Sequence, residues 1–406
     1  MHMQLSGAPA TLEDLTAAYA DAHALYDALR ARDRVTWDAT GRCWLVTGHE
    51  ATRRILADAR FISDPTVVAP PARRPARRSF LSDAVQRQVI FTDGPRQEAV
   101  RRAVLVELAR RQEALAGPLL EVARVLAERG RARGELDLLG DFAIPFSMEA
   151  ISRIMGLPEV DEEEMARLER WSTTFANITS GYLQVDVTEV VQLGDYFRAQ
   201  VAARGGTPSD DLIGAFLRDG GLDDEEDVVI QCMMAFAAGR VTTQKALGSG
   251  IPLLLPSWGE WRRQIAENPG SGRRLAEEIL RVVTPTRYVA RYAAEDLRLD
   301  GEDGREGPSI RRGDRVVLFL EAANHDPSVF ADPHALEAAR RPNPHLAFGS
   351  GSHRCPGASI ARVEVQVAVQ ALLETLAQLR PHPHAAPAWE PNPNLGGYAS
   401  YRCLCA

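Results

Sequence analysis

The sequence has few cysteines, one lysine and no hydrophobic run long enough to cross a bilayer, and each shortage excludes a class of protein. The five cysteines, Cys43, Cys232, Cys355, Cys403 and Cys405, contain no C-x-x-C pair, so a disulfide framework or a zinc cluster is not expected. The first residues show no basic segment followed by an apolar core. We therefore expect neither a targeting peptide nor a membrane partner, and a cytoplasmic location.

A surplus of positive charge is also missing. The 47 basic residues face 55 acidic ones, which gives a formal net charge of -8, and this balance argues against a nucleic-acid partner. The run "RRPARR" at residues 73–78 is a local exception. Its flanking prolines and alanines favour a surface loop over a nucleic-acid site.

Hydrophobic residues, in contrast, are plentiful and mostly spaced for helices. They make up 45% of the 406 residues and charged residues 25%, which allows a large buried core. Helical periodicity extends from Thr11 to the "LLETLAQL" run, and strand patterns are confined to residues about 33–47 and 287–320. Because no internal repeat or long polar linker occurs, the sequence predicts a mainly α protein with a small β region, in a single domain over residues 1–406.

Two predicted helices carry polar residues of interest. Residues 225–252 are apolar on nearly every face at first, yet "AAGRVTT" places Gly239 in mid-helix at a cost of about 1 kcal/mol relative to alanine. Such a local conflict in a buried helix indicates a functional site. The helix "SGRRLAEEILRVVTP" ends at Pro285 and sets Glu278 three residues before Arg281, a spacing that by itself predicts only a surface ion pair.

The most specific pattern is a cysteine loop at residues 345–357, in "HLAFGSGSHRCPGASIARVE". Its motif F-G-x-G-x-x-x-C-x-G consists of Phe348, Gly349, Gly351, Cys355 and Gly357. The glycines permit tight turns and a close approach to a flat ligand. Pro356 suits a first helical turn, and the helix dipole there is expected to favour thiolate over thiol. An electron-rich thiolate in such a loop is what a metal ligand requires.

This loop resembles the haem-binding signature of the cytochrome P-450 superfamily. Glu278 and Arg281 match the family's E-x-x-R helix, "ANHDPSVFADPHALEAARRPNPHLAFG" resembles its meander region, and Arg340 falls at the third position of that charge cluster. "DDLIGAFL", "DARFISDP" and "YDALRARDRVTWDATGRCWLVTG" are similar to soluble bacterial members, so the resemblance covers nearly the whole chain. It implies the cytochrome P-450 fold, a single helical body that encloses haem b, and a monomer.

The resemblance also implies how the haem is held. Cys355 would be the iron ligand, whose electron donation favours O–O cleavage. Glu278, Arg281 and Arg340 would form a structural network behind the cysteine loop. The propionates would meet Arg101, Arg291 and His353, with Gln97 at the position of the family's usual histidine. The remaining haem contacts implied by the family pattern are Phe348, Gly349, Gly357 and Ala238.

Over the other face of the haem, "AGRVTT" resembles the family's A-G-x-D/E-T helix, with Val241 at the acid position. The resemblance implies catalytic roles for Gly239, Thr242 and Thr243. Because valine cannot relay protons, Arg240, Thr243, Gln244 or Lys245 are the candidates to organise water instead. The implied substrate pocket consists of Met234, Ala237, Val241, Thr286 and Val289.

The function implied by the resemblance is that of a haem-thiolate monooxygenase, which inserts one oxygen atom from O2 into a small organic substrate with electrons from a ferredoxin and its reductase. Alanine and arginine are abundant and lysine is almost absent, as in proteins from GC-rich genomes. This bias and the missing acid favour a role in secondary metabolism. Two alternatives remain open. One is a haem-thiolate catalyst driven by peroxide or by an activated N–O bond of the substrate, and the other is a haem sensor without turnover.

Overall fold

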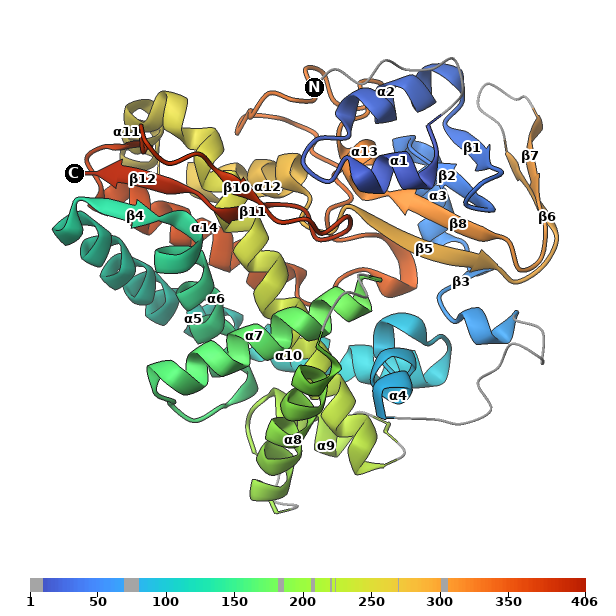
Figure 1. Ribbon diagram of the computed structural model, residues 1–406, viewed down its shortest axis with the longest axis horizontal. Helices are drawn as coiled ribbons and strands as arrows, with labels where there is room; N and C mark the ends of the chain where they lie inside the picture. The colour runs from blue at the N-terminus through green and yellow to red at the C-terminus, as the bar shows by residue number, and fades with distance from the viewer. Residues whose placement is uncertain are drawn as a thin grey trace.

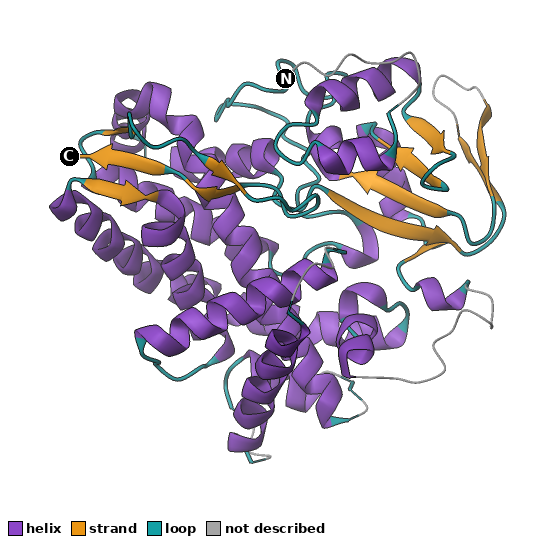
Figure 2. Cartoon of the chain, viewed as in Figure 1, coloured by secondary structure: helices purple, strands orange, loops and turns teal. Residues whose placement is uncertain are grey.

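The computed structural model describes residues 10–68, 80–181, 186–205, 209–219, 221–222, 224–268, 270–300 and 306–406. The basic run of residues 73–78 lies outside the described residues. Helices form most of the molecule and strands gather at its edges (Figure 1, Figure 2), so the prediction of a mainly α protein with a small β region is confirmed. Among the described helices, none has both the length and the apolar character that a bilayer crossing requires.

The α-helices follow the apolar periodicity of the sequence. Those in the described residues are α1 (Leu12–Ala17), α2 (His23–Arg32), α3 (His49–Ala57), α4 (Phe80–Gln86), α5 (Pro95–Arg133), α6 (Ile144–Met155), α7 (Glu162–Thr179), α8 (Val187–Ala203), α9 (Leu212–Asp219), α10 (Glu225–Gly250), α11 (Trp258–Glu267), α12 (Ser271–Val283), α13 (Leu320–Asn324) and α14 (Ala358–Thr375). Helices α5 to α12 and α14 form one body, whereas α1, α2, α3 and α13 accompany the sheet (Figure 1).

The largest sheet has five strands in the order β1-β2-β8-β5-β3, with β2 and β8 parallel and the other neighbours antiparallel. The strands are β1 (Val35–Asp38), β2 (Cys43–Val46), β3 (Phe61–Ile62), β4 (Glu135–Asp137), β5 (Tyr288–Ala293), β6 (Leu297–Asp300), β7 (Glu306–Ile310), β8 (Arg315–Phe319), β9 (Leu379–Pro381), β10 (Ala388–Trp389), β11 (Tyr398–Ser400) and β12 (Arg402–Cys405). Both predicted β regions are present. The strands β3, β4 and β9 to β12, of two to four residues each, were not predicted.

Helix α10 runs through the middle of the helical body (Figure 1), as its apolar sequence predicts. Its first turn is fixed by Asp224, whose side chain accepts a hydrogen bond of 2.7 Å from the backbone N–H of Asp227. Near its end, a Cβ atom at Gly248 would lie 2.2 Å from Leu139 Cδ1, so glycine allows α10 to pack closely on its neighbours. The helix ends at Gly250, two residues before the predicted boundary, and a 3-10 helix over Ile251–Ser257 follows it.

Candidate active site

The cysteine loop turns sharply where its glycines stand. Gly349 and Gly351 have φ angles of +65° and +71°, a region that favours glycine. A Cβ atom at Gly351 would lie 2.0 Å from the backbone oxygen of Leu56 in α3, so the loop backbone is pressed against that helix. The backbone N–H of Cys355 donates to the carbonyl of Phe348 (2.8 Å), which closes the loop. The thiol therefore stands in a rigid turn just before α14.

The Cys355 thiol is accessible to solvent, yet enough protein surrounds it that burial raises its pKa. The backbone N–H of Gly357 and the guanidinium groups of Arg101, Arg362 and Arg354 act in the opposite direction without overcoming burial. The backbone N–H at the helix start thus acts in the predicted direction, but burial outweighs it and the net pKa of the free thiol is raised. A metal ion bound to the sulfur would stabilise the thiolate.

A short strip of α10 is open in a helix that is otherwise largely buried. Ala238 is exposed, Thr242 one turn later is half-buried, and the Thr242 hydroxyl donates to the Ala238 carbonyl (2.8 Å). Gly239 serves packing as well, because a Cβ atom there would lie 2.7 Å from Ile151 Cδ1 of α6. The mid-helix glycine therefore allows α6 to approach α10. The side-chain groups that the strip presents are the methyl of Ala238 and the hydroxyl of Thr242.

The residues expected to line a substrate pocket lie in different surroundings. Met234 is half-buried and, four residues before Ala238, belongs to the same face of α10. Ala237 and Val241 are buried in the main hydrophobic core, with 3% and 4% of their surface exposed. Thr286 and Val289, before and in β5, are half-buried. The assignment of all five to a pocket stays a prediction.

Thr243, which follows the open strip, contacts an acid that sequence reasoning missed. Its hydroxyl donates to Glu364 Oε2 of α14 (2.5 Å), and both side chains are buried. Burial raises the pKa of Glu364 to about 7, although this hydrogen bond lowers it. A sequence signal was available, because Glu364 stands four residues from both Ile360 and Ala368 on the buried stripe of α14.

This acid makes stability depend on pH. The folded-state pKa of Glu364 lies above its ordinary value of 4.5, so the folded chain holds this proton more tightly than the unfolded chain. The stability that results is fully present below pH 4.5 and is lost as the pH rises through about 7. We expect the free energy of unfolding to fall by up to about 3 kcal/mol between pH 4.5 and 8 on this account. Denaturant unfolding across that range should show a flatter pH profile for Glu364→Gln. Glu113→Gln, at an exposed position of α5, is the control and should keep the wild-type slope.

The other groups proposed to organise water are engaged elsewhere. Arg240 is fully buried and donates to Ser172 Oγ of α7 (3.0 Å) and to Gln244 Oε1 (2.8 Å). Lys245 is buried and forms an ion pair with Glu390 of the C-terminal region. Of the four candidates, Thr243 alone therefore contacts a buried carboxyl group that can carry a proton.

The three residues of the expected charge cluster come together in the structure. Arg281 forms two hydrogen bonds with the Glu278 carboxylate (2.8 and 2.9 Å), and Arg340 Nε donates to the same group (2.9 Å). Glu278 and Arg281 are fully buried. Arg281 also donates to the carbonyl of Asn324, whose side chain accepts a hydrogen bond from the backbone N–H of Leu346 in the cysteine loop (2.6 Å). The cluster thus links α12, the segment after α13 and the cysteine loop.

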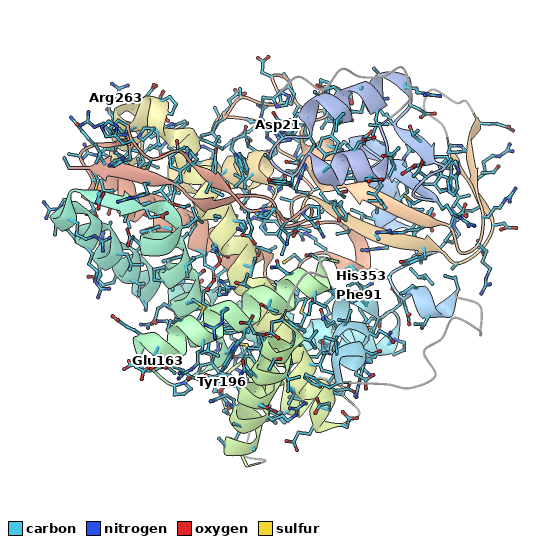
Figure 3. The ribbon with its side chains drawn as sticks, viewed as in Figure 1. Asp21, Phe91, Glu163, Tyr196, Arg263 and His353 are labelled. Atoms are coloured by element: carbon cyan, nitrogen blue, oxygen red, sulfur yellow. The ribbon has the colours of Figure 1, made fainter. Side chains whose placement is uncertain are left out.

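A buried cation lies in β5 and has no ion-pair partner among the described residues. Arg291 is 7% exposed, and its guanidinium makes one hydrogen bond, to the Ala290 carbonyl (2.8 Å), within the described part of the chain. Burial lowers its pKa to about 10, opposed by the charge of Asp93. His353, labelled in Figure 3, contacts Asp93 Oδ1 through Nε2 (2.9 Å). An unpaired buried guanidinium is costly, so this position suits an anionic ligand.

Two further candidates contact the cysteine loop directly from α5. The buried Gln97 donates from Nε2 to the Ser352 carbonyl (3.0 Å), and Arg101 donates to the Arg354 carbonyl. Burial lowers the pKa of Arg101, although the nearby Cys355 acts to raise it. These contacts place both side chains beside the loop that presents the thiol.

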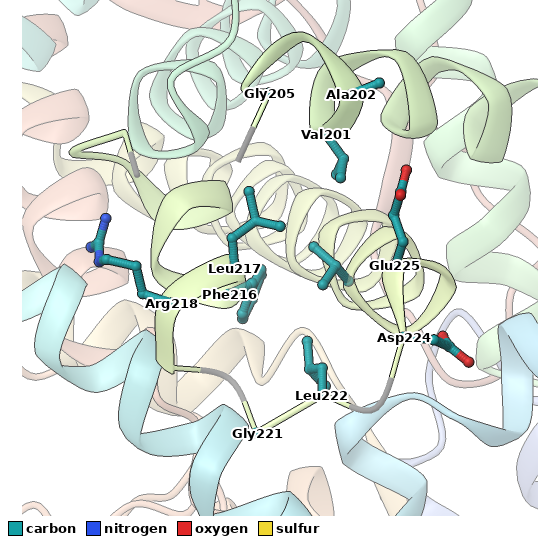
Figure 4. Close-up of a pocket in the computed structure, with 11 residues that line it drawn as sticks. Val201, Ala202, Gly205, Phe216, Leu217, Arg218, Gly221, Leu222, Asp224 and Glu225 are labelled. Atoms are coloured by element: carbon teal, nitrogen blue, oxygen red, sulfur yellow. The ribbon is translucent and has the colours of Figure 1, made fainter. Parts of the chain in front are cut away.

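A pocket of about 590 Å³ lies elsewhere and is not this site (Figure 4). It is lined by Val201, Ala202, Gly205, Phe216, Leu217, Arg218, Gly221, Leu222, Asp224, Glu225 and Val228. Val228 precedes Ala238 by ten residues on α10, which is roughly 15 Å along a helix. The pocket is therefore separate from the open strip of α10, and neither Cys355 nor a residue of its loop lines it.

The comparisons with known proteins agree with this geometry. A family model described as Cytochrome P450 matches residues 274–388. The biotin biosynthesis cytochrome P450 of Bacillus subtilis is 31% identical over 83% of this chain and 84% of its own length. The chain belongs to the cytochrome P450 family. This P450 is a monooxygenase, and haem is its cofactor.

Other relatives extend the likeness over most of the P450. The 20-oxo-5-O-mycaminosyltylactone 23-monooxygenase of Streptomyces fradiae is 31% identical over 88% of this chain and 83% of its own length. The solved structure of P450BioI in complex with an acyl carrier protein ligated to hexadec-9Z-enoic acid superposes with a TM-score of 0.83 at 28% identity. It covers 96% of this chain and 100% of its own. The predicted cytochrome P-450 fold is therefore confirmed.

The described residues of this P450 fit haem. An accessible thiol stands in a glycine loop, an open strip interrupts the buried helix α10, and a buried guanidinium has no ion-pair partner among the described residues. Thiolate is a known axial ligand of haem iron, and propionates are anions that arginine binds well. Cys355 would hold the iron, and Arg291 with Arg101 and His353 would hold the propionates.

Proposed function

We propose that this P450 uses O2 and two electrons to insert one oxygen atom into a small organic substrate of secondary metabolism, with haem b as its cofactor. The chain 1–406 would act in the cytoplasm as one monomeric domain. The observation that supports oxygen chemistry is Thr242, a hydroxyl on the open strip of α10. The Streptomyces fradiae relative is named as a 23-monooxygenase of 20-oxo-5-O-mycaminosyltylactone, and this name supports an organic substrate of secondary metabolism.

When bound, haem with a thiolate ligand supplies the activation of dioxygen. The chain supplies position and protons. The Thr242 hydroxyl already donates to the Ala238 carbonyl, so its oxygen can accept a hydrogen bond from an incoming water or acid. The methyl group of Ala238 beside it keeps the strip free of competing polar groups.

We place the proton source of this chain at Glu364. Val241 cannot carry a proton and is buried in the core, whereas Glu364 has a pKa of about 7 and contacts Thr243, next to Thr242 in α10. A group that titrates near the working pH both donates and recovers a proton readily. The acid missing from α10 would thus be replaced by one from α14.

Electrons would come from a ferredoxin and its reductase. Arg102, next to Arg101 in α5, and Arg354, whose carbonyl accepts the Arg101 hydrogen bond, are both exposed, which would make a local positive surface on an acidic protein. An acidic ferredoxin would be attracted to this surface, mainly through a faster association rate.

Thr242→Ala tests the dioxygen reaction. We expect the variant to consume electrons at a rate similar to wild type but to release peroxide, so that product per reducing equivalent falls severalfold. The amounts of product and peroxide formed and of electron donor consumed are measured in the same reaction. Thr16→Ala is the matched control, because the Thr16 hydroxyl also donates to a carbonyl of its own helix, that of Glu13 in α1.

Full coupling in Thr242→Ala would contradict the proposal. It would favour the alternative in which peroxide or an activated N–O bond of the substrate replaces dioxygen. Substrate consumption without reductant and O2 would support that alternative directly. Absence of any turnover with either oxidant would leave the sensor.

A further inference from the structure

Three histidines from distant parts of the chain meet at one point outside the haem site. His23 begins α2, His325 follows α13, and His334 lies in the loop beyond. One ring nitrogen of each lies within 4.8 Å of the others. The ring centroid of His23 is 4.3 Å from that of His325 and 4.7 Å from that of His334. No short sequence motif indicates this cluster, because α2 and α13 are far apart in the sequence.

The hydrogen bonds of the cluster leave ring nitrogens available. His325 Nδ1 contacts the Glu321 carbonyl at 2.9 Å, and since a carbonyl only accepts, Nδ1 carries the hydrogen and Nε2 keeps its lone pair. This backbone hydrogen bond through the second nitrogen is typical of metal-binding histidines. His23 Nδ1 is buried and has no hydrogen-bond partner within the described residues.

The cluster is reachable from solvent, and the carboxylate nearest to it is already occupied. His334 is exposed, so an ion could enter from solvent. The nearby Glu321 carboxylate is occupied by Arg287 Nε (2.6 Å) and by the Tyr26 hydroxyl (2.9 Å), which leaves the imidazoles as the ligands.

We propose that His23, His325 and His334 bind one divalent transition-metal ion of the zinc type, with water in the remaining position. Imidazole nitrogen suits Zn²⁺, Ni²⁺ and Cu²⁺, and a Zn–N bond of about 2.0–2.1 Å sets ligand nitrogens roughly 3.3–3.6 Å apart. Movements of about 1–1.5 Å, which side-chain rotation allows, would therefore bring the three ring nitrogens to this spacing. The bound ion would join α2, which begins two residues after the Asp21 labelled in Figure 3, to the segment after α13.

The test is Zn²⁺ titration of the haem-loaded protein by calorimetry after removal of adventitious metal. We expect one ion per chain and a rise in melting temperature with Zn²⁺. His334→Ala, chosen because the side chain is exposed, should weaken binding at least about tenfold and abolish the rise. His23→Gln should do the same.

The matched control is the double variant His382→Ala/His384→Ala, which removes a surface histidine pair with ring centroids 6.0 Å apart. It should bind Zn²⁺ as wild type does. Equal Zn²⁺ affinity in wild type and His334→Ala would overturn the proposal, as would loss of binding in the double variant or no binding at all. The haem spectrum, recorded in parallel, reports the haem site separately, so neither result depends on the proposed function.

Discussion

Replacing Cys355 by serine is expected to abolish the red-shifted absorption that reduced, carbon monoxide-bound protein shows when a thiolate ligates the iron. Turnover should be lost with it. Serine preserves size and the backbone bond to Phe348, but its hydroxyl is far less acidic and is a poor donor to iron. Difference spectroscopy of the reduced protein measures the change.

Haem content should be determined separately, because Arg291, Arg101 and His353 remain in Cys355→Ser and still offer propionate partners. Cys405→Ser is the matched control, since Cys405 lies in β12 at the C-terminal edge of the molecule and should leave the spectrum unchanged. If Cys355→Ser kept the thiolate band, another cysteine would have to be the ligand, and the site described here would be wrong.

Glu278→Gln is expected to destabilise the protein by about 3 to 5 kcal/mol, because it leaves two guanidinium groups without their shared charge. Arg281 is fully buried and Arg340 is largely so. Since the cluster reaches Leu346 through Asn324, we also expect a lower haem content at the same expression temperature. Denaturant unfolding and the haem-to-protein absorbance ratio measure the two effects.

Glu337→Gln is the control for this prediction. Glu337 is the second acid near Arg340 (3.5 Å), but its side chain is 55% exposed, and such pairs contribute about 0 to 1 kcal/mol. Similar losses in Glu278→Gln and Glu337→Gln would show that burial of the charge is not what matters.

Motifs and long helices were predictable from this sequence because their signals are local. Short stretches of sequence predict the cysteine loop, the E-x-x-R pair and α10, and all three are present in the structure. Partners across the fold were not predictable in the same way. Glu364 finds Thr243 from another helix, and Gly239 is required by Ile151 of α6, neither of which a spacing reveals.

The same distinction applies at Cys355. Position before a helix favours a thiolate, and that part is visible in sequence. The amount of protein packed around the sulfur is a property of the whole fold, and it raises the pKa of the thiol. The three imidazoles of His23, His325 and His334 are a further case, since only the folded chain brings them together.

The ion pair between Lys245 and Glu390 removes the single lysine of the chain from the surface. No ε-amino group is then left for amine-directed cross-linkers, so a carbodiimide that joins carboxylates to lysines cannot trap a docked partner through lysines of this protein. Contacts with acidic groups must instead use arginine, whose planar guanidinium binds a carboxylate in two parallel bonds and fixes the angle of approach. An encounter complex formed this way would be oriented from its first contact.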